Sequence, residues 1–294
     1  MSGVILFESL KDAFWDTLFI IPVLFLTFLL IEVVEFYFFD KVSSYVKRSG
    51  AYAPLLGALA ASFPQCGFSV IASVLYIRGF ITKGALLAVY LSTSDEAVPV
   101  LLSMPGQAEL VLPVILLKIL IGVSAGYAFD FFFGQKTLPQ NGGMDVSARG
   151  CCEHALEGKD KKDLILHPVV HTFTISTFIF AISVLINILI SLFGSAEALG
   201  GLLMSGSPMQ PLMAALFGLI PNCAISVALI MLYAKGSIAF CSLISGLCAN
   251  SGLGIWVILT KNKNRKDSLF IVSSLFLISV FAGMVLYFAL KFTG

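Results

Sequence analysis

Two short elements of the sequence combine a helix-breaking proline with an amide and a thiol, and both lie within apolar stretches. They are Pro64-Gln65-Cys66 and Pro221-Asn222-Cys223. Because proline lacks an N–H group, each element should interrupt a helix and expose backbone carbonyls and amides. The amides and thiols, with the hydroxyls of Ser69 and Ser226, would then offer an ion both hard and soft ligands. The plainer alternative is two proline kinks lined by small packing residues.

The two elements belong to an internal repeat. Residues 54–102 align without a gap on residues 211–259, an offset of 157, with 16 identities in 49 positions. Within the repeat, a long apolar span is interrupted by polar residues, and Ser92-Thr93-Ser94-Asp95-Glu96 corresponds to Ala249-Asn250-Ser251-Gly252-Leu253. We therefore place the polar side chains of both interruptions in the same predicted substrate-binding site, namely Ser94, Asn250 and Ser251.

Carboxylates inside apolar spans form a second group of candidates. An ionised side chain at the centre of a membrane helix costs about 2.5–3.5 kcal/mol on insertion scales, so it usually has a partner or a task. Asp95, Glu96 and Lys118 are therefore predicted to couple transport to an ion or proton, and the alternative is a structural salt bridge from these carboxylates to Lys118 in the next span. Glu32 and Glu35 share one face of the first span, either on a proton path or at the membrane interface.

Thiol and imidazole groups gather in the polar segment between the halves and at the start of the following span. Neutral imidazole and thiolate are typical ligands of zinc and copper. Adjacent cysteines are not a zinc-finger spacing, so the alternative is a flexible linker with incidental thiols. The candidate metal ligands are Cys151, Cys152, His154, His167 and His171.

The composition indicates an all-α polytopic membrane protein. Of the 294 residues 58% are hydrophobic and 12% charged, and the mean hydropathy is +0.98. Several runs reach the ~20 apolar residues that cross a bilayer. We predict a first membrane repeat at 1–134, a cytoplasmic Cys/His-containing linker at 135–166 and a second membrane repeat at 167–294. Nucleic-acid binding is excluded, and no cofactor is expected.

The distribution of basic residues decides how the proline elements are threaded. If each forms a re-entrant hairpin, 14 of the 18 Lys and Arg residues fall on one side, which is then cytoplasmic. The two repeats would have inverted topology, with both termini outside and about ten helical segments in total. The hairpin tips would meet near the bilayer midplane, where irregular backbone is tolerated only around protein or an aqueous cavity. Inverted repeats with broken helices are typical of secondary transporters.

The paired Pro-Gln-Cys-Gly and Pro-Asn-Cys breaks, the Ser-Thr-Ser-Asp-Glu span and the Cys-Cys-Glu-His loop followed by His-Pro-x-x-His-Thr resemble a known family. That family is the ten-transmembrane heavy-metal exporters, whose members are called arsenic efflux proteins or manganese transporters. The resemblance covers nearly the whole chain and implies export of a metal or metalloid across the plasma (inner) membrane. Thiols at the tips favour arsenite or zinc, whereas carboxylates, amides and carbonyls favour Mn²⁺.

We predict a secondary transporter that exports a heavy metal or metalloid ion through a midplane site, and not an enzyme. One alternative is a transporter or channel for a small anionic solute, because half-helix N-termini attract anions. A membrane-embedded enzyme is the other, although the sequence contains no HExxH, CxxC or Walker A motif. A homo-oligomer is left open.

The double substitution Cys66→Ser with Cys223→Ser should abolish transport of a thiophilic ion without preventing folding, because it removes both tip thiols. Accumulation of arsenite and Zn²⁺ in cells measures the effect, and membrane abundance is the control for folding. Transport at the wild-type rate would remove sulfur from the mechanism.

Overall fold

Every element of the described structure is a helix or a helical turn. The computed structural model describes residues 52–64, 67–94, 96–104, 106–133, 163–193 and 207–293, together with eight positions between 18 and 29. In chain order the elements are α2 (Ala53–Ala61), α3 (Gly67–Ile77), α4 (Lys83–Ser92), α5 (Ala97–Ser103), η2 (Ala108–Leu110), α6 (Val111–Phe133), α7 (Asp163–Phe193), α9 (Met209–Gly218), α10 (Cys223–Ala234), α11 (Phe240–Ala249), α12 (Leu253–Lys261) and α13 (Arg265–Thr293).

The predicted helix interruptions are confirmed. The first proline element separates α2 from α3, and the second separates α9 from α10. The polar stretches within the long spans likewise separate α4 from α5 and α11 from α12. Helices α3 and α10 both end at a glycine with positive φ, Gly79 at 78° and Gly236 at 73°. In both copies of the repeat, the N–H group of the residue after this glycine donates to a carbonyl in the last turn of the helix. This is the usual glycine C-terminal motif.

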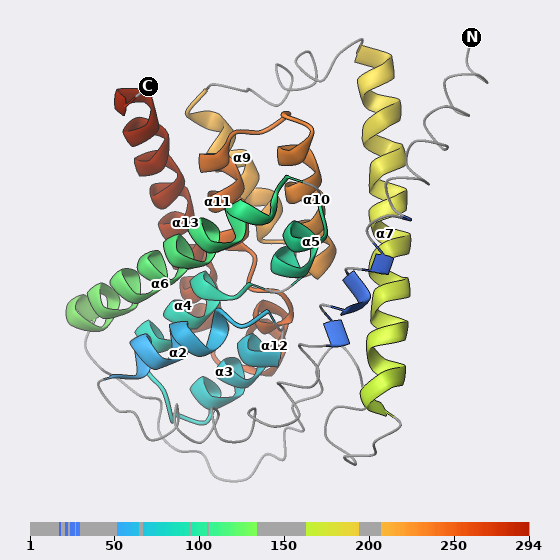
Figure 1. Ribbon diagram of the computed structural model, residues 1–294. Coiled ribbons are helices and arrows are strands. Elements are labelled where there is room, and N and C mark those ends of the chain that lie inside the picture. The colour runs from blue at the N-terminus through green and yellow to red at the C-terminus, as the bar shows by residue number, and fades with distance from the viewer. Residues whose placement is uncertain are drawn as a thin grey trace.

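The packing of the helices follows the repeat. Within each copy, α4 packs on α2 and α6 as α11 packs on α9 and α13. Between the copies, α3 packs on α12 and α10 packs on α5, so each hairpin contacts the broken span of the other copy. Helices α4 and α11 contact each other at the centre. Figure 1 shows α2, α3 and α12 in the lower part of the view and α9, α10 and α11 in the upper part.

Glycines allow the long helices to approach the broken ones closely, and this feature also repeats at the offset of 157. A Cβ atom on Gly126 of α6 would lie 2.8 Å from the Cβ of Ala88. A Cβ atom on Gly283 of α13 would lie 2.6 Å from the Cβ of Ser245. Small residues at such crossings are typical of membrane helices, which gain stability from close backbone packing. The structural repeat therefore extends to α6 and α13, beyond the aligned residues.

Burial separates central helices from peripheral ones. Four described segments are long and apolar enough to cross a membrane: Lys83–Ser103, Ala108–Phe133, Phe240–Lys261 and Arg265–Phe292. Most residues are buried in the first segment (94%) and in the third (72%). Few are buried in the second (17%) and in the fourth (28%). The broken spans therefore form the core, and α6 and α13 present apolar side chains outwards, as expected of helices that face lipid. Helix α7 lies on the side of the molecule opposite to α6 and contacts α10 (Figure 1).

A buried carboxylate joins the two copies. The Asp267 cluster consists of Asp267, Lys83, Tyr76 and Asn262. Lys83 Nζ lies 2.5 Å from Asp267 Oδ1, and the Tyr76 hydroxyl donates to Asp267 Oδ2 at 2.7 Å. The Asn262 amide donates to the same oxygen at 3.1 Å. The turn after α3 and the turn after α12 therefore lie at the same end of the molecule.

Gln210 makes a comparable connection within the second copy. Its Nε2 donates to the carbonyl of Ser237 at 3.2 Å, and its Oε1 accepts from the N–H group of Ala239 at 3.0 Å. The start of α9 and the turn between α10 and α11 therefore lie side by side. The chain enters and leaves this hairpin at one end.

Helix α7 begins earlier than predicted. The sequence suggested a linker as far as residue 166 and a second membrane repeat from residue 167, but α7 begins at Asp163. An acidic residue in the first turn interacts favourably with the helix dipole, and this favours a start at Asp163. Residues 163–166 are thus helical, and the division of the chain at residue 166 stays a prediction.

The substitution Asp267→Asn should lower the free energy of unfolding by about 1–3 kcal/mol, because it leaves the Lys83 ammonium without its carboxylate in a largely buried cluster. Thermal and denaturant unfolding of the purified protein in detergent measures the change. Lys263→Met, an exposed substitution in the same loop, is the matched control. Equal stability of Asp267→Asn and the wild type would contradict a stabilising role for the cluster.

Candidate functional site

Asn250 connects the interruption of α11–α12 to the tip of the second hairpin. Its Nδ2 donates to Ser226 Oγ at 2.8 Å and to the carbonyl of Asn222 at 3.3 Å. Its Oδ1 accepts from the N–H group of Gly252 at 3.0 Å and so stabilises the interrupted backbone. The Asn222 side chain caps α10 by accepting from Ala224 N at 3.0 Å. Asn250 therefore lies within hydrogen-bond distance of two other residues that are predicted to bind substrate, Asn222 and Ser226.

Lys118 links the interrupted spans of both copies. It is 1% exposed, although it belongs to α6, whose surface is otherwise mostly exposed. Its Nζ donates to the carbonyl of Thr93, which follows the last turn of α4, and to the carbonyl of Leu247 in α11 at 2.8 Å. Both carbonyls belong to helix C-termini, where the helix dipole places partial negative charge. The positive charge of the ammonium thus stabilises the partial negative charge at two helix C-termini.

A hydroxyl pair joins the first hairpin to the interruption in the second copy. Ser73 Oγ and Tyr90 OH lie 2.6 Å apart, and the Tyr90 hydroxyl donates to the carbonyl of Gly254 at 2.9 Å. A Cβ atom on Gly254 would lie 2.8 Å from the Cβ of Ser69 and 2.9 Å from its carbonyl oxygen. Glycine at this position therefore lets α12 approach the backbone of α3 next to the predicted ligand Ser69.

The remaining predicted residues of the interruptions are buried. Ser94 is 1% exposed and donates to the carbonyl of Ser92 at 3.3 Å. Ser251 is fully buried, and its hydroxyl has no hydrogen-bond partner among the described residues. Glu96 is 4% exposed and precedes the first residue of α5. The candidate site thus contains several polar groups that are buried in the interior of the protein.

Several predicted residues lie outside the part of the chain that the structure describes. These are Glu32, Gln65, Cys66, Asp95, Cys151, Cys152 and His154, and also the side chains of His167, His171 and Cys223. Their roles in coupling, metal binding and substrate binding stay predictions. In the described ranges no group of three His, Cys, Asp or Glu residues is arranged to hold a metal ion.

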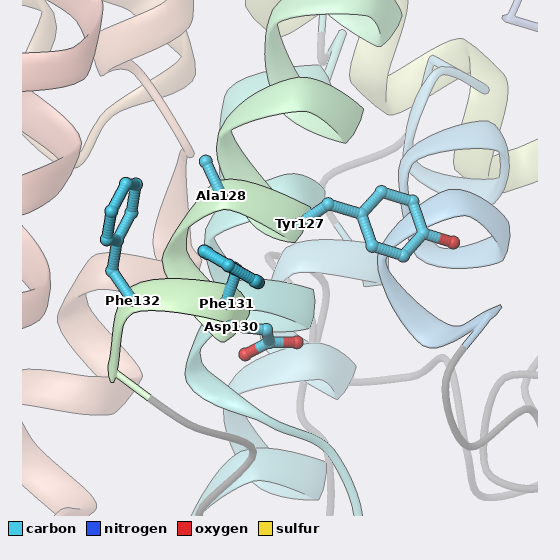
Figure 2. Close-up of a pocket in the computed structure, with 5 residues that line it drawn as sticks. All are labelled: Tyr127, Ala128, Asp130, Phe131 and Phe132. Carbon is cyan, nitrogen blue, oxygen red and sulfur yellow. The ribbon is translucent and has the colours of Figure 1, made fainter.

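A surface hollow lies at the C-terminal end of α6. It is lined by Tyr127, Ala128, Asp130, Phe131 and Phe132. Figure 2 shows Tyr127 and Phe132 projecting from opposite sides of the helix. Both Asp130 carboxylate oxygens already accept hydrogen bonds, from Thr82 Oγ1 at 2.6 Å and from Gly84 N at 3.0 Å. Because twelve residues of helix separate Asp130 from Lys118, about 18 Å, the hollow is distinct from the candidate site.

Comparison with known proteins assigns the family. The model of the family described as "Putative, 10TM heavy-metal exporter" matches residues 2–167 and 160–291. The chain belongs to this family. It is therefore a multi-pass membrane protein of a heavy-metal exporter family, as the resemblance implied. No curated protein and no solved structure matches the chain.

The sequence alone did not reveal the residues that connect the two copies of the repeat. Ser73 lies four residues after Ser69, a helical spacing that could have indicated it. Tyr90 and Gly254 had no comparable signal, because Tyr90 lies in α4 and Gly254 in α12, and only the tertiary packing brings the two together. Lys118 was identified, but its two carbonyl acceptors could not be inferred from residue types.

Tyr90→Phe should reduce the free energy of unfolding by about 1–2 kcal/mol, since it removes the hydroxyl that donates to the buried Gly254 carbonyl. Thermal unfolding of the purified protein measures the loss. Tyr127→Phe, which removes a hydroxyl from an exposed side chain, is the matched control. Identical stabilities for the two variants would contradict a role of this bond in joining the copies.

Proposed function

We propose that the chain is a secondary transporter that exports a heavy-metal ion through a site formed by the hairpin tips and the interrupted spans. The observation that carries this proposal is the Asn250 amide, which bonds both the tip carbonyl of Asn222 and the hydroxyl of Ser226. This amide thereby links the tip of the second hairpin to the interrupted span, and Asn250 and Ser226 are both buried. Membership of the exporter family supports the class of substrate.

The proposal includes inverted repeats. The Asp267 cluster and the Gln210 bonds support re-entrant hairpins, because single crossing helices would put the connected segments at opposite ends. The reciprocal packing of α3 on α12 and of α10 on α5 supports a two-fold relation between the copies. In this topology the Lys-rich loops are cytoplasmic, both termini are outside, and the membrane is the plasma membrane.

The polar atoms described at the centre favour a cation over an anion. They include the carbonyls of Thr93, Leu247 and Asn222 and the hydroxyls of Ser226 and Ser251. The buried ammonium of Lys118 already donates to two carbonyls, so it is not arranged as an anion receptor. Oxygen ligands of this kind suit hard or borderline metal ions such as Mn²⁺. The tip thiols of Cys66 and Cys223 keep arsenite and Zn²⁺ among the candidates to be tested.

Metal accumulation tests the function in cells that lack their own exporters, loaded in parallel with Mn²⁺, Zn²⁺ and arsenite. Expression of the wild-type chain should lower the accumulation of at least one of them. Asn250→Asp should reduce that export at least about tenfold, because it removes two donors while keeping the Oδ1 acceptor for Gly252.

Asn264→Asp is the matched control. It makes the same chemical change at an exposed loop residue whose side chain acts as an acceptor for Asp267 N. The control should export as the wild type does. Undiminished export by Asn250→Asp would show that the centre is not the transport site, and unchanged accumulation of all three ions with the wild type would contradict the proposed function.

A further inference from the structure

The Lys118 ammonium occupies a position with the features of a cation site. Lys118 is the eighth residue of α6, so its Cα lies about 11 Å along the helix axis from the helix start. Its ammonium reaches inwards to two backbone carbonyls and is almost completely buried. A charge buried at this depth persists only where oxygen atoms replace its hydration.

The two acceptors come from equivalent structural situations in the two copies. Thr93 follows α4 and Leu247 lies in the last turn of α11, so each carbonyl is at a half-helix C-terminus. Such carbonyls lack the helical partner that a continuous helix would supply. Half-helix C-termini and unwound carbonyls are the groups that bind cations at the midplane of transporters with broken helices.

Only one copy supplies the cation. The offset of 157 maps Lys118 onto Leu275, which is fully buried and apolar. The two copies thus contribute one carbonyl each but a single ammonium between them. The contact of Lys118 with the two carbonyls is therefore not a packing contact that each copy of the repeat makes for itself.

We propose that the carbonyls of Thr93 and Leu247 form a cation seat that the Lys118 ammonium fills in this state, and that the exported metal cation takes the seat when Lys118 withdraws. This inference rests on the proposed function, and it deepens it by naming a hard, oxygen-preferring cation as the substrate class. The buried hydroxyl of Ser251, which has no partner among the described residues, is a further oxygen in the same interruption. Lys118 therefore acts as a tethered substitute for the substrate.

Chemical rescue of the purified full-length protein tests the seat directly. Lys118→Ala should lower the melting temperature, and millimolar methylammonium chloride should raise it again by several degrees. The small ammonium can enter the vacated space and donate to both carbonyls, and binding to the folded state alone stabilises it. Tetramethylammonium chloride at equal ionic strength should have no effect, because it has no N–H donor.

Leu275→Ala is the matched control, since it opens a comparable space at the equivalent position without removing a charge. Methylammonium should not stabilise this variant. Equal rescue of both variants, or no rescue of Lys118→Ala, would overturn the proposal. Lys118→Met covers the case in which the alanine variant fails to fold, because it retains most of the aliphatic stem. A methionine variant that melts at the wild-type temperature would also overturn it.

Binding of Mn²⁺ alone tests whether the metal uses the same seat. Lys118→Ala should bind Mn²⁺ at least about tenfold more tightly than the wild type, because two cations in one site repel each other. Methylammonium should compete with Mn²⁺ in that variant. Equal Mn²⁺ affinity in both proteins, or binding without competition, would overturn the shared seat. Failure of the exporter function would appear separately, as unchanged metal accumulation in cells that express the wild type.

Discussion

A backbone interrupted in an apolar interior must find hydrogen-bond partners within the protein, and this requirement explains most of the described structure. A continuous helix satisfies its own carbonyls, but α4 and α11 end inside spans that are long enough to cross a membrane. Lys118 supplies donors to the carbonyl that follows α4 and to one in the last turn of α11. Asn250 performs the equivalent task for the hairpin tip. At these three interruptions a polar side chain from elsewhere in the fold supplies the missing hydrogen-bond donor.

This requirement also explains why the two copies cannot be regarded as separate domains. The Tyr90 hydroxyl of the first copy donates to Gly254 of the second, and Lys118 of the first reaches Leu247 of the second. Helix α3 packs on α12 and α10 packs on α5, so each hairpin packs against the broken span of the other copy. A candidate site between two such copies depends on both and belongs to neither alone.

The sequence predicted the helix interruptions because their causes are local. Proline at positions 64 and 221 lacks the N–H group that a continuous helix uses, and polar runs around Ser94 and Ser251 interrupt the apolar spans. It also identified Asn222, Ser226 and Asn250, which the structure brings together. The carbonyls bound by Lys118 could not be predicted, because every residue has a carbonyl and only the packing selects two of them. The partner of Tyr76 escaped prediction for the same reason, since Asp267 lies 191 residues away.

The Asp267 cluster makes the two ends of the molecule energetically unequal. The offset of 157 relates Lys83 to Phe240 and Asp267 to Leu110, so neither charge has a counterpart at the other end. In the alternating-access cycle that the proposed inverted repeats imply, perfectly equivalent copies would give the two access states equal free energies. A cluster that forms at one end alone introduces a bias, and every 1.4 kcal/mol of it changes the population ratio about tenfold. The resting protein would then favour the conformation in which that end is closed, before any ion gradient or substrate acts on it.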